Sequence, residues 1–204
     1  MMQLLFTLII SFSCFNTFSA ELSAPKKLVL LGDSLTEGLG VSRDSTFAAL
    51  VQEKLKKNNK NWIVTNSGVS GSTSASAPSR MKWILKSKPD LILLAIGAND
   101  ALRGLKIEAT KKNILEAIML AQKSAVKVIL AGMLAPPNYG KSYTQEFSKL
   151  YKDVAHQTKV KLIPFLLEGV AGHPELNIAD GLHPNEKGHQ IVAEIVYKAI
   201  EEYL

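Results

Sequence analysis

Short apolar runs alternate with helical patterns along the chain. Most of the runs are continuous rather than alternating with polar residues, which is typical of strands that are buried on both faces. Five such runs, rich in Leu, Ile and Val, lie at 27–31, 62–66, 90–97, 126–132 and 160–167. The pattern therefore predicts five buried strands.

The segments between these runs show the spacing of amphipathic helices. Three apolar stripes stand out: Phe47, Leu50, Val51 and Leu55; Ile114, Ala117, Ile118 and Ala121; and Ile191, Ile195, Val196 and Ala199. Alternating strands and helices predict a parallel sheet covered by helices on both sides, an α/β fold. Trp62 and Trp83 fall in a predicted strand and a predicted helix, so we expect both in the core.

Composition indicates one globular domain. The chain has 204 residues, 47% of them hydrophobic and 21% charged, with a net charge of +6. Nucleic acid is not an expected partner, because lysines are scattered and the arginines that grip phosphate number only three, Arg43, Arg80 and Arg103. The one dense cluster, Lys54 to Lys60, is typical of a helix end.

The first twenty residues carry no charged side chain and have an apolar stretch from Leu4 to Ile10, followed by small residues. This pattern predicts a secretory signal peptide over 1–20, cleaved after Ala20 or alternatively after Ala24, and a single domain over 21–204. We therefore expect export to the periplasm or beyond. Removal of the segment also removes Cys14, the only cysteine, so the mature chain would have no disulfide or thiol nucleophile.

Small and polar residues follow the predicted strands. In an open parallel sheet the carboxyl ends of the strands meet at one edge, where ligands bind. The stretch at 67–79, "SGVSGSTSASAPS", has the composition of a flexible linker, but its place after a strand favours a loop at this edge. Five residues in such positions carry candidate chemistry: Ser34, Gly71, Asn99, Asp180 and His183.

Ser34 and His183 are candidates for nucleophilic catalysis. A serine hydroxyl attacks only when a base takes its proton, and histidine is the usual base, oriented by an acid. Asp180 precedes His183 by three residues in "DGLHP", a spacing at which the carboxylate can meet the ring. On this fragment alone, a turn that caps the last helix explains the pattern equally well.

Acyl transfer also needs hydrogen-bond donors for the oxyanion. The backbone N–H of Ser34, the backbone N–H of Gly71 and the side-chain amide of Asn99 are candidates. Each has a structural alternative, but their joint occurrence at one sheet edge favours the functional interpretation. Asp33, Asp100 and Arg103 flank the site, and we assign them to a turn, a helix cap and a loop anchor.

Four motifs together resemble the SGNH, or GDSL, hydrolase family: "GDSL", "SGVSGSTS", "GAND" and "DGLHP". The resemblance implies a flavodoxin-like three-layer α/β/α sandwich with a five-stranded parallel sheet. It implies Ser34 as nucleophile, His183 as general base, Asp180 as its orienting acid, and an oxyanion hole of Ser34, Gly71 and Asn99. No metal or cofactor is required. "GANDALRG" and "APPNYGKSY" further resemble bacterial periplasmic esterases of the thioesterase I, lysophospholipase and arylesterase type.

The implied substrates are small-molecule acyl esters such as lysophospholipids, acyl thioesters and aryl esters. We expect the acyl group to rest on Met133, Leu134, Tyr139 and Leu182, beside a loop stiffened by two prolines at 136–137. The positive charge allows transient contact with an anionic membrane surface, and we expect a monomer.

Three alternatives remain. A carbohydrate O-acetyl esterase on the same scaffold would take acetyl and reject octanoyl esters. A catalytically silent binding module would be indicated by a lost motif residue, and all five are present. A nucleotide-binding flavodoxin-like protein would use "GDSLTEGLG" for phosphate, but this stretch lacks the Gly-Lys-Ser/Thr ending of a P-loop.

Overall fold

The computed structural model describes residues 24–204 and contains a five-stranded parallel sheet in the order β2-β1-β3-β4-β5. The strands are β1 (Lys26–Gly32), β2 (Trp62–Gly68), β3 (Leu91–Ala95), β4 (Lys127–Ala131) and β5 (Lys161–Ile163). Each lies within or overlaps one predicted apolar run, so the five strands and the α/β class are confirmed. The predicted signal peptide lies outside the described residues.

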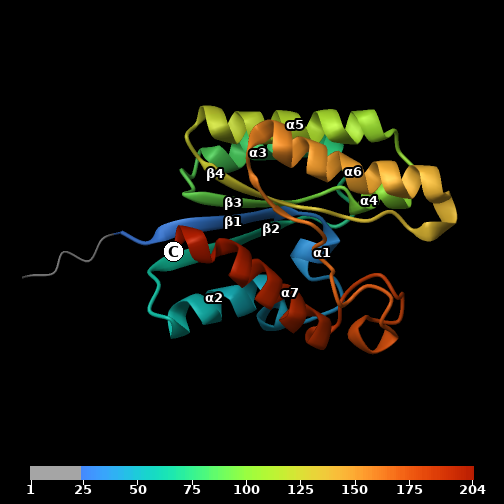
Figure 1. The fold of residues 1–204 in the computed structure, drawn as a ribbon. Coiled ribbons are helices and arrows are strands. Elements are labelled where there is room, and N and C mark those ends of the chain that lie inside the picture. The colour runs from blue at the N-terminus through green and yellow to red at the C-terminus, as the bar shows by residue number, and fades with distance from the viewer. Residues whose placement is uncertain (1–23) are drawn as a thin grey trace, which may run out of the picture.

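Helices cover both faces of the sheet and complete three layers. Their bounds are α1 (Ser34–Glu37), α2 (Phe47–Lys57), α3 (Ala77–Leu85), α4 (Ala98–Leu102), α5 (Ile107–Lys123), α6 (Lys141–Thr158) and α7 (Glu186–Ile200). Figure 1 shows α3, α5 and α6 on one face and α2 and α7 on the other. The predicted stripes on α2, α5 and α7 are the sides that pack against the sheet, because they carry the buried or half-buried side chains.

Two strands are shorter than their apolar runs. The fifth run extends to residue 167, but β5 ends at Ile163 because Pro164 has no N–H to continue the ladder. The third run extends to residue 97, but β3 ends at Ala95, and Gly97 adopts a left-handed φ of 119°. At both places the chain leaves the sheet toward the site described below.

The expectation that both tryptophans lie in the core is wrong for Trp83. Trp62 is 7% exposed, whereas Trp83 is 70% exposed. The buried stripe of α3 consists of Ala77, Met81 and Ile84, at the i, i+4, i+7 spacing of one helix side. Trp83 lies about 100° around the helix from Ile84, outside this stripe.

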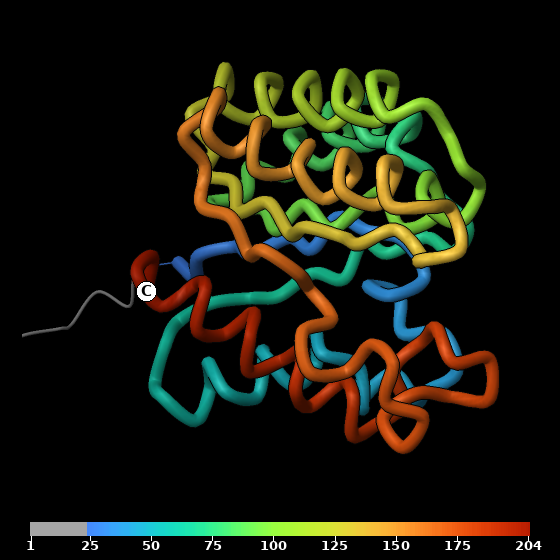
Figure 2. Tube along the Cα trace, turned by 45° about the vertical axis from the view of Figure 1, so that its right-hand side comes forward, coloured from blue at the N-terminus to red at the C-terminus, as the bar shows by residue number. Residues whose placement is uncertain are grey.

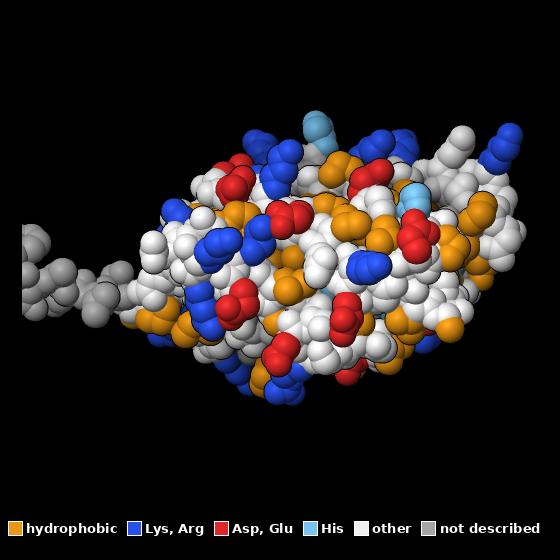
Figure 3. Space-filling model, turned by 90° about the horizontal axis from the view of Figure 1, so that it is seen from below, with side chains coloured by type: hydrophobic (Ala, Val, Ile, Leu, Met, Phe, Trp, Pro, Cys, Tyr) orange, Lys and Arg blue, Asp and Glu red, His pale blue; other side chains and the backbone are white. Residues whose placement is uncertain are grey.

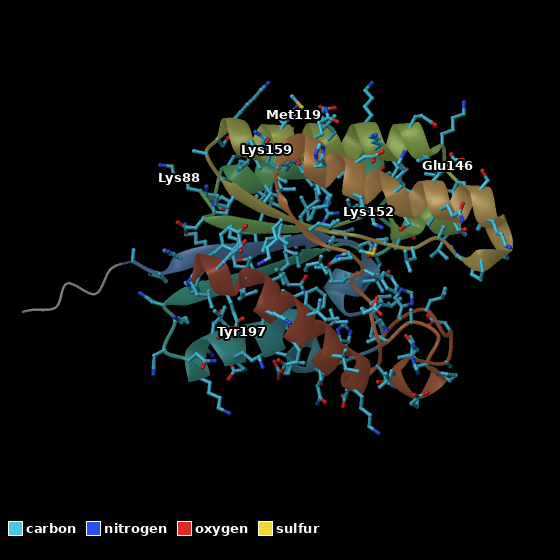
Figure 4. The ribbon with its side chains drawn as sticks, in the orientation of Figure 1. Lys88, Met119, Glu146, Lys152, Lys159 and Tyr197 are labelled. Carbon is cyan, nitrogen blue, oxygen red and sulfur yellow. The ribbon has the colours of Figure 1, made fainter. Side chains whose placement is uncertain are left out.

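The outer surface formed by α2 and α7 is mixed in charge. Figure 3 shows Lys and Arg side chains interspersed with Asp and Glu over this face, without a large region of one sign. Over residues 24–204, no helix combines the length and the apolar character that crossing a bilayer requires.

The loops that follow the strands gather at one edge of the sheet. Figure 2 shows the long connection from β5 to α7 passing from the sheet to the region beside α1. Its isolated bridge between Asn177 and Pro184 closes the connection on itself just before α7 begins. This edge carries the candidate catalytic residues.

Packing of the sheet centre gives a first prediction. Leu93 is completely buried in β3, between β1 and β4, and Leu93→Ala should lower the free energy of unfolding by about 3 kcal/mol. Met119 projects outward from α5 and is 46% exposed, so Met119→Ala is the matched control and should change stability by less than about 0.5 kcal/mol. Urea midpoints of both variants measure the difference, and equal midpoints would contradict the assigned core.

Candidate active site

Ser34 is positioned by the tight passage from β1 into α1. Asp33 is the N-cap of α1, and its Oδ1 accepts a hydrogen bond from the Leu35 N–H at 3.1 Å. Gly32 is required before it, because a Cβ there would lie 1.9 Å from Thr36 Oγ1 and 2.8 Å from the Ala95 carbonyl oxygen. The Ser34 side chain therefore emerges at the carboxyl end of β1, on the first turn of a helix.

Ser34, His183 and Asp180 form a continuous hydrogen-bonded chain. Ser34 Oγ lies 2.7 Å from His183 Nε2, and His183 Nδ1 lies 2.6 Å from Asp180 Oδ2. The structure thus brings together all three residues expected for the catalytic triad, although 149 positions separate the serine from the histidine.

The Asp180 carboxylate is held by the turn in which it lies. Its Oδ1 accepts hydrogen bonds from the N–H groups of Leu182 at 2.8 Å and His183 at 3.0 Å, and Gly181 permits the turn with a φ of 69°. Burial acts to raise the pKa of Asp180, but these two N–H groups and the His183 ring outweigh it and lower the pKa. The "DGLHP" fragment is therefore both a turn before the last helix and a fixed carboxylate–imidazole pair.

The two other expected oxyanion donors lie on a helix and a loop that follow the strands on either side of β1. Asn99 is on α4 and lines the same cavity as Ser34. Gly71 lies in the loop after β2 with a φ of 74°, and its carbonyl oxygen accepts a hydrogen bond from Arg103 Nη2 at 3.0 Å. Arg103 thus anchors the loop, as expected from the sequence.

Asp100 joins the same loop to α4. This buried carboxylate accepts the Ser74 N–H at 2.7 Å and the Ser74 hydroxyl at 2.5 Å, and also the Thr110 hydroxyl at 3.0 Å. Asp100 is not the helix cap predicted for it, because it lies within α4, whose N-cap is Gly97. It instead connects α4 and α5 to the segment that contains Gly71.

A cavity of about 460 Å³ opens beside Ser34 and His183. Met133, Leu134 and Leu182 line it, as predicted for the acyl site. Tyr139 is absent from the lining, and its hydroxyl instead donates to the Leu102 carbonyl oxygen at 2.7 Å. Phe165 and Leu167 line the cavity and were missed, because they were assigned to the fifth strand, which Pro164 ends early.

A second, larger hollow of about 960 Å³ lies along α2 and β2. Charged residues such as Arg43, Asp44 and Glu53 contribute to its walls, and none of the five candidate catalytic residues does. We place the site in the smaller cavity because only that one contains a nucleophile in contact with a base.

Two buried titratable groups lie close to the triad. Burial raises the pKa of Asp33 to about 6, although the Leu35 N–H, His183 and Arg80 act in the opposite direction. Burial, with a smaller contribution from His183, lowers the pKa of His189 to about 4. His189 Nδ1 accepts the Phe47 N–H at 3.2 Å and its ring stacks on Phe47, so the neutral ring caps the start of α2.

The three-layer fold and the Ser-His-Asp arrangement define a serine hydrolase. Residues 30–191 match the GDSL-like Lipase/Acylhydrolase family, and the chain belongs to this family. It is an ester hydrolase of the SGNH type.

Similar proteins are ester hydrolases. An arylesterase from Vibrio mimicus is 34% identical over 96% of this chain and 98% of its own length. A "Thioesterase 1/protease 1/lysophospholipase L1" from Escherichia coli strain K12 is 31% identical over 91% of this chain and 87% of its own. The crystal structure of TesA superposes with a TM-score of 0.85 at 35% identity, and the alignment covers 88% of this chain and all of TesA.

The two buried groups predict opposing contributions to acid stability. The pKa of His189 is about 4 in the folded state and 6.5 ordinarily, so the unfolded state binds the extra proton between these values. Stability from His189 is present above pH 6.5 and is lost as the pH falls toward 4. Asp33 has a raised pKa of about 6 against 3.8, so its contribution increases as the pH falls through that window.

When the pH falls from 7 to 5, the free energy of unfolding of His189→Asn should fall by about 2 kcal/mol less than that of the wild type, because the variant lacks the histidine contribution. At pH 7 the variant should be destabilised by about 1–3 kcal/mol, because the ring fills a buried site. Urea unfolding at the two pH values measures both effects. His156→Asn, at an exposed position on α6, is the control and should follow the wild type. An equal change in the free energy of unfolding of His189→Asn and of the wild type between pH 7 and pH 5 would contradict the lowered pKa assigned to His189.

Proposed function

We propose that the chain hydrolyses carboxylic esters and thioesters in two steps through an acyl-enzyme on Ser34. The observation that carries this proposal is the Ser34–His183–Asp180 hydrogen-bonded chain at the wall of an apolar cavity. The serine has its base within 2.7 Å and the base has its orienting carboxylate within 2.6 Å. This is the arrangement that acyl transfer by a serine needs.

In the first step, Ser34 Oγ attacks the carbonyl carbon while His183 Nε2 takes the hydroxyl proton. The imidazolium that forms is stabilised by Asp180, whose lowered pKa keeps it charged. When the tetrahedral intermediate collapses, His183 returns the proton to the leaving alcohol or thiol. A water molecule then repeats the sequence on the acyl-enzyme and releases the carboxylic acid.

The negative charge of the tetrahedral intermediate falls on the former carbonyl oxygen. We assign its stabilisation to the Ser34 N–H, the Gly71 N–H and the Asn99 side-chain amide. The position of Asn99 in the cavity wall beside Ser34 supports this assignment. So does the left-handed backbone of Gly71, a conformation that a residue with a side chain rarely adopts. Neither step uses a metal or a cofactor.

The cavity suits the acyl part of the substrate. Its lining is mainly apolar, with Met133, Leu134 and Leu182 joined by Phe165 and Leu167. Lysophospholipids, acyl thioesters and aryl esters all present an apolar group to such a surface. The names of the similar proteins include arylesterase, thioesterase and lysophospholipase activities, which supports the same range.

Replacement of the nucleophile tests the mechanism. Ser34→Ala should lower kcat for p-nitrophenyl esters by at least roughly a thousandfold, because no other group supplies the attacking oxygen. The substrate series runs from acetyl to palmitoyl, and the thermal midpoint of each protein confirms folding. Ser124→Ala, at an exposed position after α5, is the matched control and should keep wild-type rates.

The same series separates two substrate classes. Hydrolysis of octanoyl and longer esters by the wild type supports the lipid and thioester range. Activity confined to acetyl esters would favour the carbohydrate O-acetyl esterase instead. Equal rates in the wild type and Ser34→Ala would overturn the serine mechanism, and a folded wild type that hydrolyses no ester would leave the silent binding module.

We further propose export of a monomeric domain over 21–204 and transient contact with an anionic membrane. The first twenty residues support export, as argued from their sequence. Leu102, Leu134 and Leu182 line the cavity and are 39%, 47% and 47% exposed, so an apolar rim surrounds its mouth. Arg103 and Lys106 follow on the exposed segment after α4 and add positive charge.

This contact predicts a charge-dependent association. Ser34→Ala protein should co-sediment with phosphatidylglycerol vesicles at low salt more than with phosphatidylcholine vesicles, and 0.5 M salt should remove the difference, because exposed charges are screened. Lys106→Glu should weaken binding, whereas Lys159→Glu, at the C-cap just after α6, should not. Equal sedimentation with both lipids, or none with either, would contradict the proposal.

A further inference from the structure

The loop that contains Gly71 is attached to the segments that present Ser34 and Asn99. At its start, the Val69 N–H donates to the Gly32 carbonyl oxygen at 3.1 Å, immediately before the Asp33 cap. Farther along, Asp100 on α4 accepts two hydrogen bonds from Ser74. The loop therefore connects the end of β1, just before Ser34, with the Asn99 helix α4.

Glu37 supplies a further attachment that the mechanism does not use. It is the last residue of α1, three positions after Ser34, and its carboxylate faces the loop. Glu37 Oε2 accepts the Ser70 N–H at 2.7 Å and is also hydrogen-bonded by the Ser70 hydroxyl. A charged acceptor that takes two donors from one residue holds that residue more firmly than a neutral one would.

These bonds hold the peptide group that carries the Gly71 N–H. That N–H belongs to the peptide between Ser70 and Gly71. Glu37 holds the residue before the peptide, and Arg103 holds the Gly71 carbonyl oxygen after it at 3.0 Å. Because Gly71 has no side chain and lies at a φ of 74°, its own conformational preference does not fix the direction of its N–H. The hydrogen bonds made by Glu37 and Arg103 must therefore set that direction.

We propose that Glu37 is a positioning residue that, through Ser70, directs the Gly71 N–H at the developing oxyanion. This inference rests on the proposed esterase function and on Gly71 as a donor. Removal of one oxyanion donor costs roughly 100- to 1,000-fold in kcat. A displaced donor retains part of its effect, so loss of Glu37 should cost about tenfold.

The test compares variants at an exposed residue, which limits the damage to folding. Glu37→Ala should lower kcat for p-nitrophenyl butyrate by about tenfold with KM changed less than about twofold, since the interaction serves the transition state. Glu37→Gln keeps an oxygen acceptor for Ser70 and should stay within about threefold of wild type. Glu53→Ala removes an exposed carboxylate from α2 and is the matched control, expected to keep wild-type kcat.

Two further readouts separate positioning from general stability. Ser70→Ala should lower kcat less than Glu37→Ala, because the backbone N–H bond remains, and adding Ser70→Ala to Glu37→Ala should cause no further loss. The affinity of an alkyl boronic acid, which forms a charged tetrahedral adduct with Ser34, should fall in parallel with kcat. Thermal midpoints should stay within a few degrees of wild type.

Wild-type kcat in Glu37→Ala would overturn the inference and leave the esterase proposal intact. Equal losses in Glu37→Ala and Glu37→Gln, with unchanged boronic acid affinity, would also overturn it. Absence of Ser34-dependent hydrolysis in the wild type would overturn the proposed function and this inference with it.

Discussion

The hydrogen bond between Ser34 Oγ and His183 Nε2 is the contact on which the site depends. It joins the first turn after β1 to the last turn before α7, two segments whose residues are 149 positions apart in the sequence. Neither partner acts alone, because a serine without a base is a weak nucleophile and a histidine without a fixed tautomer is a poor base. The sheet must therefore place two distant loops within hydrogen-bonding distance.

The parallel sheet meets this requirement because all of its strands run in the same direction. All strands end at the same edge, so the loops after β1, β2, β3 and β5 share one surface. Adjacent strand order matters as well. β1 lies between β2 and β3, and these are the strands that precede the Gly71 loop and the Asn99 helix. The segments that carry the expected oxyanion donors therefore follow the two strands on either side of the strand that precedes Ser34.

The sequence supports prediction of this arrangement because its signals are local. A continuous apolar run predicts a buried strand, and the residue after it is then placed at the carboxyl edge whatever the tertiary details. Ser34 and Asn99 could be located in this way. The Asp180–His183 pair was also accessible, since a three-residue spacing lets the two side chains meet within one turn.

The features that sequence reasoning missed depend on contacts between distant segments. Whether Trp83 faces the core depends on which side of α3 packs against the sheet. Tyr139 lies outside the cavity lining, and its hydroxyl donates a hydrogen bond to the Leu102 carbonyl oxygen. His189 resembles any residue of an amphipathic helix until its ring is seen to cap α2. Glu37 gives no signal in sequence, because its partner Ser70 lies 33 positions away.

Different environments also give different roles to the two aspartates at the site, Asp33 and Asp180. Asp180 is partly exposed and accepts two backbone N–H groups and the His183 ring, so its carboxylate is favoured. Asp33 is buried, one of its oxygens has no hydrogen-bond partner among the described residues, and its pKa is raised. A base that must become an imidazolium needs a reliably charged partner. Only Asp180 meets this need, which leaves Asp33 to cap the helix that presents Ser34.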